Sequence, residues 1–241
     1  MSKRTGIAIG VVVAGFFIGG VFGPMLNAAL TRARIRGQVE AYLNSHPVRK
    51  LQIGAGSVNY DGWLNTDIAP TTQQVYLDAT QRFPFPDGSI HYIFAEQVIE
   101  HLTYEDGLAM LRECHRVLAP GGKIRLTTPN LLKYFQLFQQ PRTPEIQRFI
   151  AAKLKFHNWT ATTRPESLIV NMQFRLFGHQ YLYDPDTLAD SLAQVGFQDI
   201  AQFPQGESDD PQLRGIEARH NDPLARESND WESMAFQAVR P

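Results

Sequence analysis

Glycines and carboxylates that follow short apolar runs are the residues best placed to do chemistry in this chain. Residues 51–53 are followed by Gly54, Ala55 and Gly56, and glycines at such a point let a bulky ligand approach the backbone closely. Asp67 is expected at the tip of the next strand, where its carboxylate can accept two hydrogen bonds from a ribose diol. Asp78 ends the third extended run, where it can accept a hydrogen bond from an adenine amino group or cap a turn.

The glycine pattern also argues against one class of enzyme. The third glycine of a dinucleotide-binding fingerprint falls at Asn59 and is therefore missing. No Tyr-x-x-x-Lys proton relay is recognisable in a helix after the fourth predicted strand. Both observations disfavour a nicotinamide- or flavin-dependent oxidoreductase.

Short strands alternate with helices along the chain, which predicts a parallel sheet covered by helices. Amphipathic helices are predicted at 103–118 and 184–195. Residues 131–183 are expected to form a helical lid or insert, and the polar stretch 205–231 a long exposed loop. The predicted strands are residues 49–54, 63–68, 75–78, 90–95, 123–128, 197–203 and 234–239.

The first thirty residues indicate a membrane segment. Residues 6–30 carry no charge and are rich in apolar side chains, and about 20 such residues in a helix cross a bilayer core. A single-pass anchor is favoured over a signal peptide cleaved near Ala29, which would leave a secreted, non-enzymatic protein. The flanking cations barely favour either orientation. Gly15, Gly19 and Gly23 share one helix face, which offers a contact for a homodimer.

Composition narrows the remaining function classes. The formal net charge of −1 argues against a protein that coats nucleic acid, because binding a phosphate backbone requires clustered cations. Cys114 is the only cysteine, so no internal disulfide framework exists, and it is expected to be a small buried residue. No His, Cys or carboxylate cluster has metal-ligand spacing along the chain, which predicts no metal site.

The motifs taken together resemble the class I S-adenosylmethionine-dependent methyltransferases, from about residue 51 to the C-terminus. The resemblance implies a Rossmann-like α/β fold with a mostly parallel seven-stranded sheet and helices on both faces, here preceded by one transmembrane helix. It implies S-adenosylmethionine as cofactor, held by Gly54, Ala55, Gly56, Asp67, Ile68, Asp78 and Glu96. The motifs are residues 53–56 (Ile-Gly-Ala-Gly), 62–67 (Gly-Trp-Leu-Asn-Thr-Asp), 83–90 (Phe-Pro-Phe-Pro-Asp-Gly-Ser-Ile), 96–102 (Glu-Gln-Val-Ile-Glu-His-Leu), 111–122 (the helix end and its Pro-Gly-Gly turn), 178–183 and 192–197.

Three features depart from that family pattern. Gln52 stands where an acid usually helps to hold the methionine end of the cofactor, and His91 stands where an aspartate is usual. Gly56 and Asp67 are too close in sequence for a full crossover helix, so the first helix is expected to be short or lost.

His101 is the first candidate for the base that activates an oxygen nucleophile, since it follows the fourth strand and titrates near neutrality. Glu100 and Glu96 are alternatives, and Tyr181 and His179 are candidates to line the acceptor pocket or to be structural. The resemblance predicts methyl transfer to a small, glycan or lipid-linked acceptor near the membrane. A catalytically silent, membrane-tethered scaffold or sensor is the alternative.

The domain boundaries follow from these predictions. Residues 1–36 form the anchor with its basic flanks, 37–48 a connector, and 49–241 the methyltransferase domain. Because S-adenosylmethionine is a cytoplasmic metabolite, this domain is expected to face the cytoplasm. The lid is locally basic with interleaved aromatics, which suits anionic lipid headgroups, a phosphorylated acceptor or only a solvated helix face. Its cations are Lys133, Arg142, Arg148, Lys153, Lys155 and Arg164.

Overall fold

The computed structural model describes residues 29–160, 164–217 and 223–241 of the chain. Residues 1–28 of the predicted anchor, which spans 1–36, lie outside these residues, and so does the glycine face proposed for a homodimer. In the described part of the chain, no helix is both long enough and apolar enough to cross a membrane.

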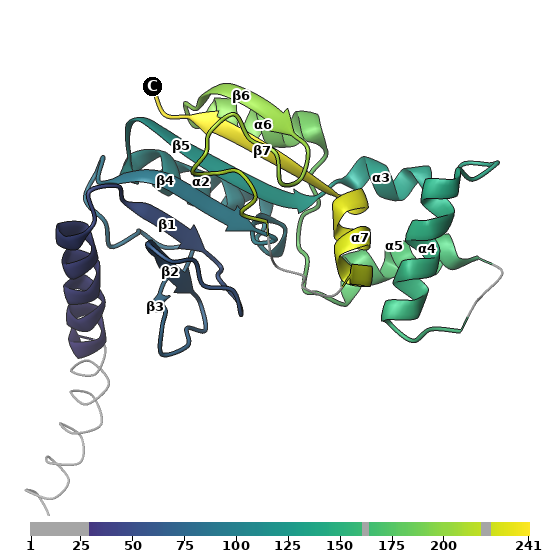
Figure 1. Cartoon of the computed structure of the whole chain (residues 1–241), viewed down its shortest axis with the longest axis horizontal. Helices are drawn as coiled ribbons and strands as arrows, with labels where there is room; N and C mark the ends of the chain where they lie inside the picture. The colour runs from purple at the N-terminus through teal and green to yellow at the C-terminus, as the bar shows by residue number, and fades with distance from the viewer. Residues whose placement is uncertain (1–28, 161–163, 218–222) are drawn as a thin grey trace, which may run out of the picture.

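Seven strands form one sheet, in the order β3-β2-β1-β4-β5-β7-β6 (Figure 1). The first five strands in this order are parallel, and β7 runs antiparallel between β5 and β6. This confirms the predicted Rossmann-like α/β fold with a mostly parallel seven-stranded sheet. The strands are β1 (Lys50–Ile53), β2 (Trp63–Asp67), β3 (Val75–Tyr76), β4 (Ile90–Glu96), β5 (Leu118–Pro129), β6 (Gln198–Phe203) and β7 (Ser233–Val239).

One face of the sheet carries the main hydrophobic core. Side chains alternate along each strand, so Leu51 and Ile53 of β1 share this face with Ile93 of β4 and Ile124 of β5. Helices α2 (Tyr104–Val117) and α6 (Pro185–Gln194) pack on this core. The helix of residues 29–45 adds Val39 and Tyr42 to the same cluster, so the predicted connector is part of the folded domain.

Helix α2 forms where its sequence pattern predicted it. Thr103 caps its first turn by accepting a hydrogen bond from the Asp106 amide at 3.1 Å, which satisfies one of the free N–H groups at a helix start. Its apolar face includes Leu111 and Cys114, both buried in the core. Burial raises the pKa of the Cys114 thiol well above its usual range, which confirms the structural role expected of it.

The opposite face of the sheet is covered by an irregular segment, residues 204–217, and not by helices. Leu213 packs there against Trp63 and Phe94, and residues 204–217 contain turns and bends only. The prediction of helices on both faces is therefore wrong for this face in the described structure. Residues 54–62, between β1 and β2, contain no helix. Of the two predicted outcomes, a short or a lost first crossover helix, the structure shows the loss.

A buried ion pair fastens this covering segment to the sheet. The Arg125 guanidinium, fully buried on β5, bonds the Glu217 carboxylate and donates to Gln237 Oε1 at 2.8 Å. Lys123 Nζ lies 3.1 Å from Asp210 Oδ2. The prediction of an exposed loop at residues 205–231 is therefore wrong. Asp210 and Glu217 of this stretch pair with Lys123 and Arg125 of the sheet.

Four helices form a separate layer beyond the carboxyl ends of the strands (Figure 1). The predicted lid, residues 131–183, supplies three of them, and α7 comes from the stretch expected to be a loop. Phe149 packs on Trp231 with ring centroids 4.1 Å apart, which fixes α4 against α7. The helices are α3 (Leu131–Gln136), α4 (Pro144–Phe156), α5 (Pro165–Arg175) and α7 (Pro223–Glu232).

Arg116, near the end of α2, holds the irregular chain that leads into β4. It donates to the carbonyls of Phe83 and Phe85 at 3.1 and 2.9 Å and pairs with Glu113 at 2.5 Å. Glu113 also accepts a hydrogen bond from the Phe83 amide at 2.8 Å. The hydrogen bond from Arg116 lowers the pKa of Glu113 despite partial burial.

This network predicts an acid-sensitive contribution to stability. A carboxyl group whose pKa is lowered by folding stabilises the fold above its unfolded pKa, about 4–5, and loses that contribution as pH falls through the folded pKa. We expect Glu113→Gln to lower the free energy of unfolding by about 1–2 kcal/mol at pH 7. The loss should shrink towards pH 3.

Denaturant unfolding from pH 7 to pH 3 measures both effects. Glu105→Gln is the matched control, since Glu105 is an exposed residue of the same helix. Parallel pH profiles for Glu113→Gln and the unmodified chain would contradict this assignment.

Candidate functional site

The predicted cofactor residues gather at the carboxyl edge of the parallel strands. Gly54 follows β1, and Asp67 and Glu96 are the last residues of β2 and β4. These three strands are neighbours, and the strand order reverses between β1 and β4. Ligands of open α/β sheets bind at such a switch point, beyond the carboxyl ends of the strands.

Glycine is required at the first position of the loop after β1. Gly54 has φ of +68°, and a Cβ atom there would lie 2.3 Å from Val98 Cγ2. Gly56 also has a positive φ, +55°, while the buried Ala55 donates its amide to the Thr66 carbonyl at 2.9 Å. The loop is therefore pressed against the chain that follows β4, with its backbone at the edge of the sheet.

The Asp67 carboxylate organises the same loop. Its Oδ2 accepts the Gly56 amide and its Oδ1 accepts the Ala69 amide, both at 2.8 Å. A carboxylate offers about four lone-pair sites, so these two bonds leave capacity for a ribose diol. The contact with a ribose stays a prediction.

Ile68 and Asp78 contribute differently from each other. Ile68 is 58% exposed and offers apolar surface next to Asp67. Asp78 Oδ1 accepts hydrogen bonds from the amide and hydroxyl of Thr80 at 2.9 and 2.8 Å. Asp78 thus caps a turn, which is one of the two roles predicted for it. Its contact with an adenine is untested.

Two departures from the family pattern have structural consequences. Gln52 is buried, and its Oε1 has no hydrogen-bond partner among the described residues. His91 Nδ1 accepts a hydrogen bond from the Arg49 amide at 3.0 Å, so this side chain supports the start of β1. Neither residue supplies the carboxylate that the pattern usually has there.

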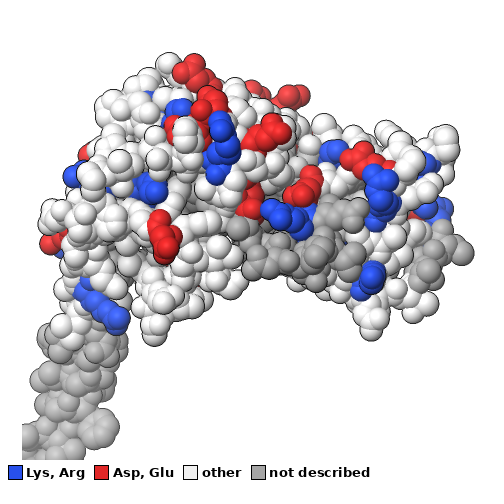
Figure 2. Space-filling model, viewed as in Figure 1, with Lys and Arg blue, Asp and Glu red and all other residues white. Residues whose placement is uncertain are grey.

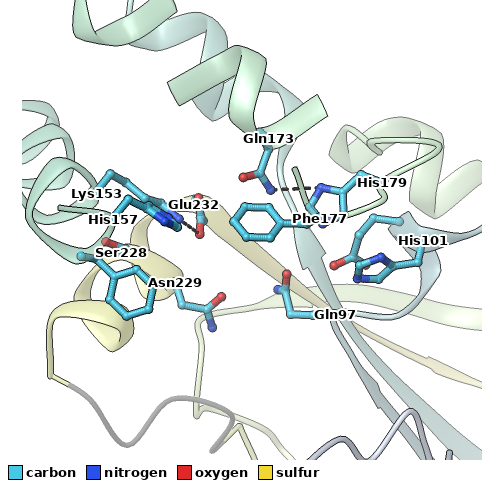
Figure 3. Close-up of a pocket in the computed structure, with 12 residues that line it drawn as sticks. Gln97, His101, Lys153, His157, Gln173, Phe177, His179, Ser228, Asn229 and Glu232 are labelled. Carbon is cyan, nitrogen blue, oxygen red and sulfur yellow. Dashed lines mark hydrogen bonds and ion pairs between the residues drawn. The ribbon is translucent and has the colours of Figure 1, made fainter. Parts of the chain in front are cut away.

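A cavity of about 260 Å³ lies between the end of β4 and the helical layer (Figure 3). Glu100 and His101, in the turn η1 (Ile99–His101), form part of its wall, as does His179. The structure therefore brings both predicted catalytic residues to one cavity with a predicted lining residue. The other lining residues are Gln97, Lys153, Phe156, His157, Gln173, Phe177, Ser228, Asn229 and Glu232.

The two histidines of the predicted site contact each other. The His101 and His179 rings are 4.8 Å apart at an interplanar angle of 74°. Burial, helped by the nearby His101, lowers the pKa of His179 to about 4. His179 is therefore a neutral imidazole near pH 7. The Tyr181 ring lies at a tilt of 44° to that of Tyr104, with centroids 5.0 Å apart. Neither Tyr181 nor Glu96 lines the cavity.

The side chains from α4 and α7 were not predicted as site residues. Lys153 Nζ lies 2.6 Å from Glu232 Oε1, and Tyr134 donates to Glu232 Oε2 at 2.7 Å. Burial and the nearby Lys153 lower the pKa of His157. Glu232 lies far from Lys153 and Tyr134 in the chain. No spacing between neighbouring residues could therefore predict these contacts from the sequence.

The lid is less basic than its sequence suggested. Glu166 pairs with both Arg142 and Arg164, and Lys153 is engaged by Glu232. Figure 2 shows acidic and basic side chains interspersed over the visible face. Ion pairing within the helical layer thus weakens the argument for a strongly cationic binding surface.

Known proteins show what this arrangement resembles. Residues 51–126 match the model of a methyltransferase domain family. The match includes the glycine loop, Asp67, Asp78, Glu96, Glu100 and His101. Residues 51–126 are therefore similar to a methyltransferase domain, which supports S-adenosylmethionine as the cofactor and disfavours the oxidoreductase alternative.

Two relatives show the same similarity. The chain is 39% identical over 61 residues to a probable S-adenosylmethionine-dependent methyltransferase of Mycolicibacterium smegmatis. It is 29% identical over 137 residues to another of Mycobacterium tuberculosis. The matches cover 25% and 57% of this chain but only 23% and 36% of those relatives.

A solved S-adenosylmethionine-dependent methyltransferase from Archaeoglobus fulgidus covers 88% of this chain and 93% of its own at 16% identity, with a TM-score of 0.48. At that score the likeness adds no argument, and the fold assignment rests on the strand order.

The contact between Gly54 and Val98 can be tested directly. We expect Gly54→Ala to lower the free energy of unfolding by about 2–4 kcal/mol, since it combines a positive φ with a steric clash. In a Val98→Ala background the same change should cost at least about 1 kcal/mol less. Denaturant unfolding of the four chains of this cycle measures the coupling. Additive costs would show that Val98 does not press on the loop.

Proposed function

We propose that this chain transfers the methyl group of S-adenosylmethionine to a small, glycan or lipid-linked acceptor near a membrane. The observation that carries the proposal is the cavity beside His101, which adjoins the end of β4 and thus the predicted cofactor edge. About 260 Å³ is below the size common for drug-sized ligands, about 300–1,000 Å³. It suits a small acceptor or the reactive end of a larger one.

The residues at the carboxyl edge fit the cofactor at its nucleoside end. Gly54 and Gly56 are partly exposed, Asp67 retains acceptor capacity for a ribose, and the exposed Ile68 offers apolar surface to an adenine. The methionine end lacks the usual carboxylate at Gln52. Glu96, which is buried at the end of β4, is another of the predicted cofactor residues, and we assign it to that side.

When bound, S-adenosylmethionine supplies a methyl group on a sulfonium with an excellent leaving group. The protein then has to align an acceptor and remove its proton. His101 is placed for this in the cavity wall, and the Gln180 amide side chain donates to the His101 carbonyl at 2.7 Å. The neutral His179 beside it does not repel a protonated His101.

The membrane context rests on the sequence alone. Residues 6–30 have the length and apolarity of a single-pass anchor, and the cofactor is a cytoplasmic metabolite. We therefore place the catalytic domain on the cytoplasmic side, with a homodimer through the glycine face as a further possibility for residues 15–23. The membrane would then concentrate a lipid-linked acceptor near the domain.

One observation favours a second function. Gln52 is buried at the position where related enzymes place an acid. A chain that binds the cofactor without turnover, serving as a membrane-tethered scaffold or sensor, could tolerate that change. Turnover distinguishes the two functions.

Cofactor binding is the first test. We expect the full-length chain in detergent micelles to bind S-adenosylmethionine and S-adenosylhomocysteine in calorimetric titrations. Asp67→Asn should weaken binding by about 1.4 kcal/mol or more, a tenfold change, because it removes an acceptor for the ribose and the loop. Asp61→Asn is the matched control, an exposed aspartate of the same connection. No binding of either ligand to the folded chain would refute the proposal.

Turnover is the second test. With radiolabelled methyl donor and a lipid-containing cell extract, we expect His101→Asn to reduce kcat by about 100-fold or more. Its affinity for S-adenosylmethionine should stay within about twofold. His46→Asn is the control, because His46 does not line the cavity. It stacks on Tyr42, whose hydroxyl donates to the Lys50 carbonyl at the start of β1. Cofactor binding without any labelled product would favour the silent module.

A further inference from the structure

We propose that Glu100, His101 and His179 bind a divalent transition-metal ion in the wall of the acceptor cavity. One potential ligand atom from each residue lies within 4.8 Å of the other two. This inference rests on the proposed function only for the role of the ion in catalysis. The sequence predicted no metal site, because no cluster of ligands is spaced along the chain. The three residues meet only in the folded structure, since His179 comes from a distant segment.

Backbone hydrogen bonds hold the two ligand segments together. The amides of Gln180 and Tyr181 both donate to the Glu100 carbonyl, at 2.8 and 3.2 Å. The Gln180 side chain donates to the His101 carbonyl at 2.7 Å. His179 is therefore fixed beside Glu100 and His101 by its own neighbours, which is the preorganisation that a binding site requires.

Outer contacts orient the ligands. The Thr128 hydroxyl donates to Glu100 Oε2 at 3.0 Å. The Gln173 amide lies 3.4 Å from His179 Nδ1, and its Oε1 is buried without a hydrogen-bond partner among the described residues. Rotating this amide by 180° lets Oε1 accept a hydrogen bond from the protonated Nδ1 of His179. That tautomer leaves the lone pair of His179 Nε2 for a metal, with Gln173 as the second-sphere partner common at metal-bound histidines.

The spacing of the ligand atoms is close to what an ion requires. Metal–ligand bonds of about 2.0–2.2 Å put ligand atoms about 3–3.5 Å apart, against a largest separation of 4.8 Å here. Binding must therefore draw the atoms together by an ångström or so. Side-chain torsions of the partly exposed histidines can supply this movement without a change in the backbone.

The ligand set selects the class of ion. Two imidazoles and one carboxylate suit zinc and the neighbouring divalent transition metals, whereas calcium and magnesium prefer oxygen ligands. Lys153, the cation in the cavity wall, is engaged by Glu232, so it does not compete for Glu100. Three protein ligands leave coordination positions open, as in catalytic sites.

An open position beside the cofactor edge has a chemical use. An ion held by Glu100, His101 and His179 would acidify an acceptor hydroxyl, whose proton would pass to water. The acceptor oxygen would then form its bond to the methyl carbon as the carbon–sulfur bond breaks, with S-adenosylhomocysteine as the leaving group. The inference thus narrows the acceptor to one with an oxygen nucleophile. It assigns His101 to the metal and not to the role of free base.

Cobalt(II) titration tests the site without any methyl transfer. The full-length chain, prepared without a polyhistidine tag and stripped with a chelator, should develop a visible d–d absorption band and bind Co²⁺ with one-to-one stoichiometry. His179→Ala should lose the band and bind about 100-fold more weakly. Gln173→Leu, which changes only the outer contact, should weaken binding about 10-fold.

His157→Ala is the matched control, since His157 lines the same cavity outside the cluster. It should bind Co²⁺ as the unmodified chain does. Equal affinity in His179→Ala, or no band in the unmodified chain, would overturn the inference. If circular dichroism shows that His179→Ala does not fold, the Co²⁺ affinity of Gln173→Leu is the deciding measurement. An affinity equal to that of the unmodified chain would then overturn the inference.

Titration with S-adenosylmethionine on the same samples separates this outcome from the proposed function. A chain that binds S-adenosylmethionine but no Co²⁺ keeps the methyltransferase proposal and returns His101 to the role of base. A chain that binds Co²⁺ but no S-adenosylmethionine keeps the metal site and loses the proposed reaction.

Discussion

The short connection between β1 and β2 constrains the rest of this structure. Residues 54–62 must cross from the end of one parallel strand to the start of the next, and so short a stretch cannot hold a full crossover helix. One face of the sheet consequently lacks its usual helical cover. Because apolar side chains such as Trp63 and Phe94 lie on that face, another part of the chain has to shield them from water.

Residues 204–217 cover these apolar side chains, and covering them requires the burial of charged groups. The segment is polar, and it buries Arg125 of β5 against Glu217. A buried pair of this kind contributes little net stability, but removing one partner costs about 3–5 kcal/mol. The pair therefore specifies where the segment lies more than it strengthens the fold.

Contacts between α4 and α7 help to build the cavity. Helix α7 packs on α4 through Trp231 and Phe149 and through the buried contact between Glu232 and Lys153. The helical layer is thus assembled from two parts of the sequence, residues 131–183 and α7. The cavity lies between this layer and the turn after β4, so its shape depends on contacts among elements that no single motif encodes.

Local sequence patterns determined the sheet, the glycine loop and the residues at the carboxyl edge. Alternating apolar residues, the Gly-Ala-Gly turn and the capped helix at Thr103 act over a few residues, so their physics is readable from the chain alone. The lost crossover helix was also predictable, because it follows from the separation of Gly56 and Asp67.

Only the tertiary structure decided what covers the second face and which side chains meet in the cavity. The charges of residues 205–217 read as those of a solvated loop, since Lys123 and Arg125, the partners of Asp210 and Glu217, lie on a distant strand. The sequence likewise placed His101 and His179 as separate candidates and found no metal-ligand spacing. Their approach depends on backbone hydrogen bonds between residues far apart in the chain, and such long-range pairings leave no periodic signal in the sequence.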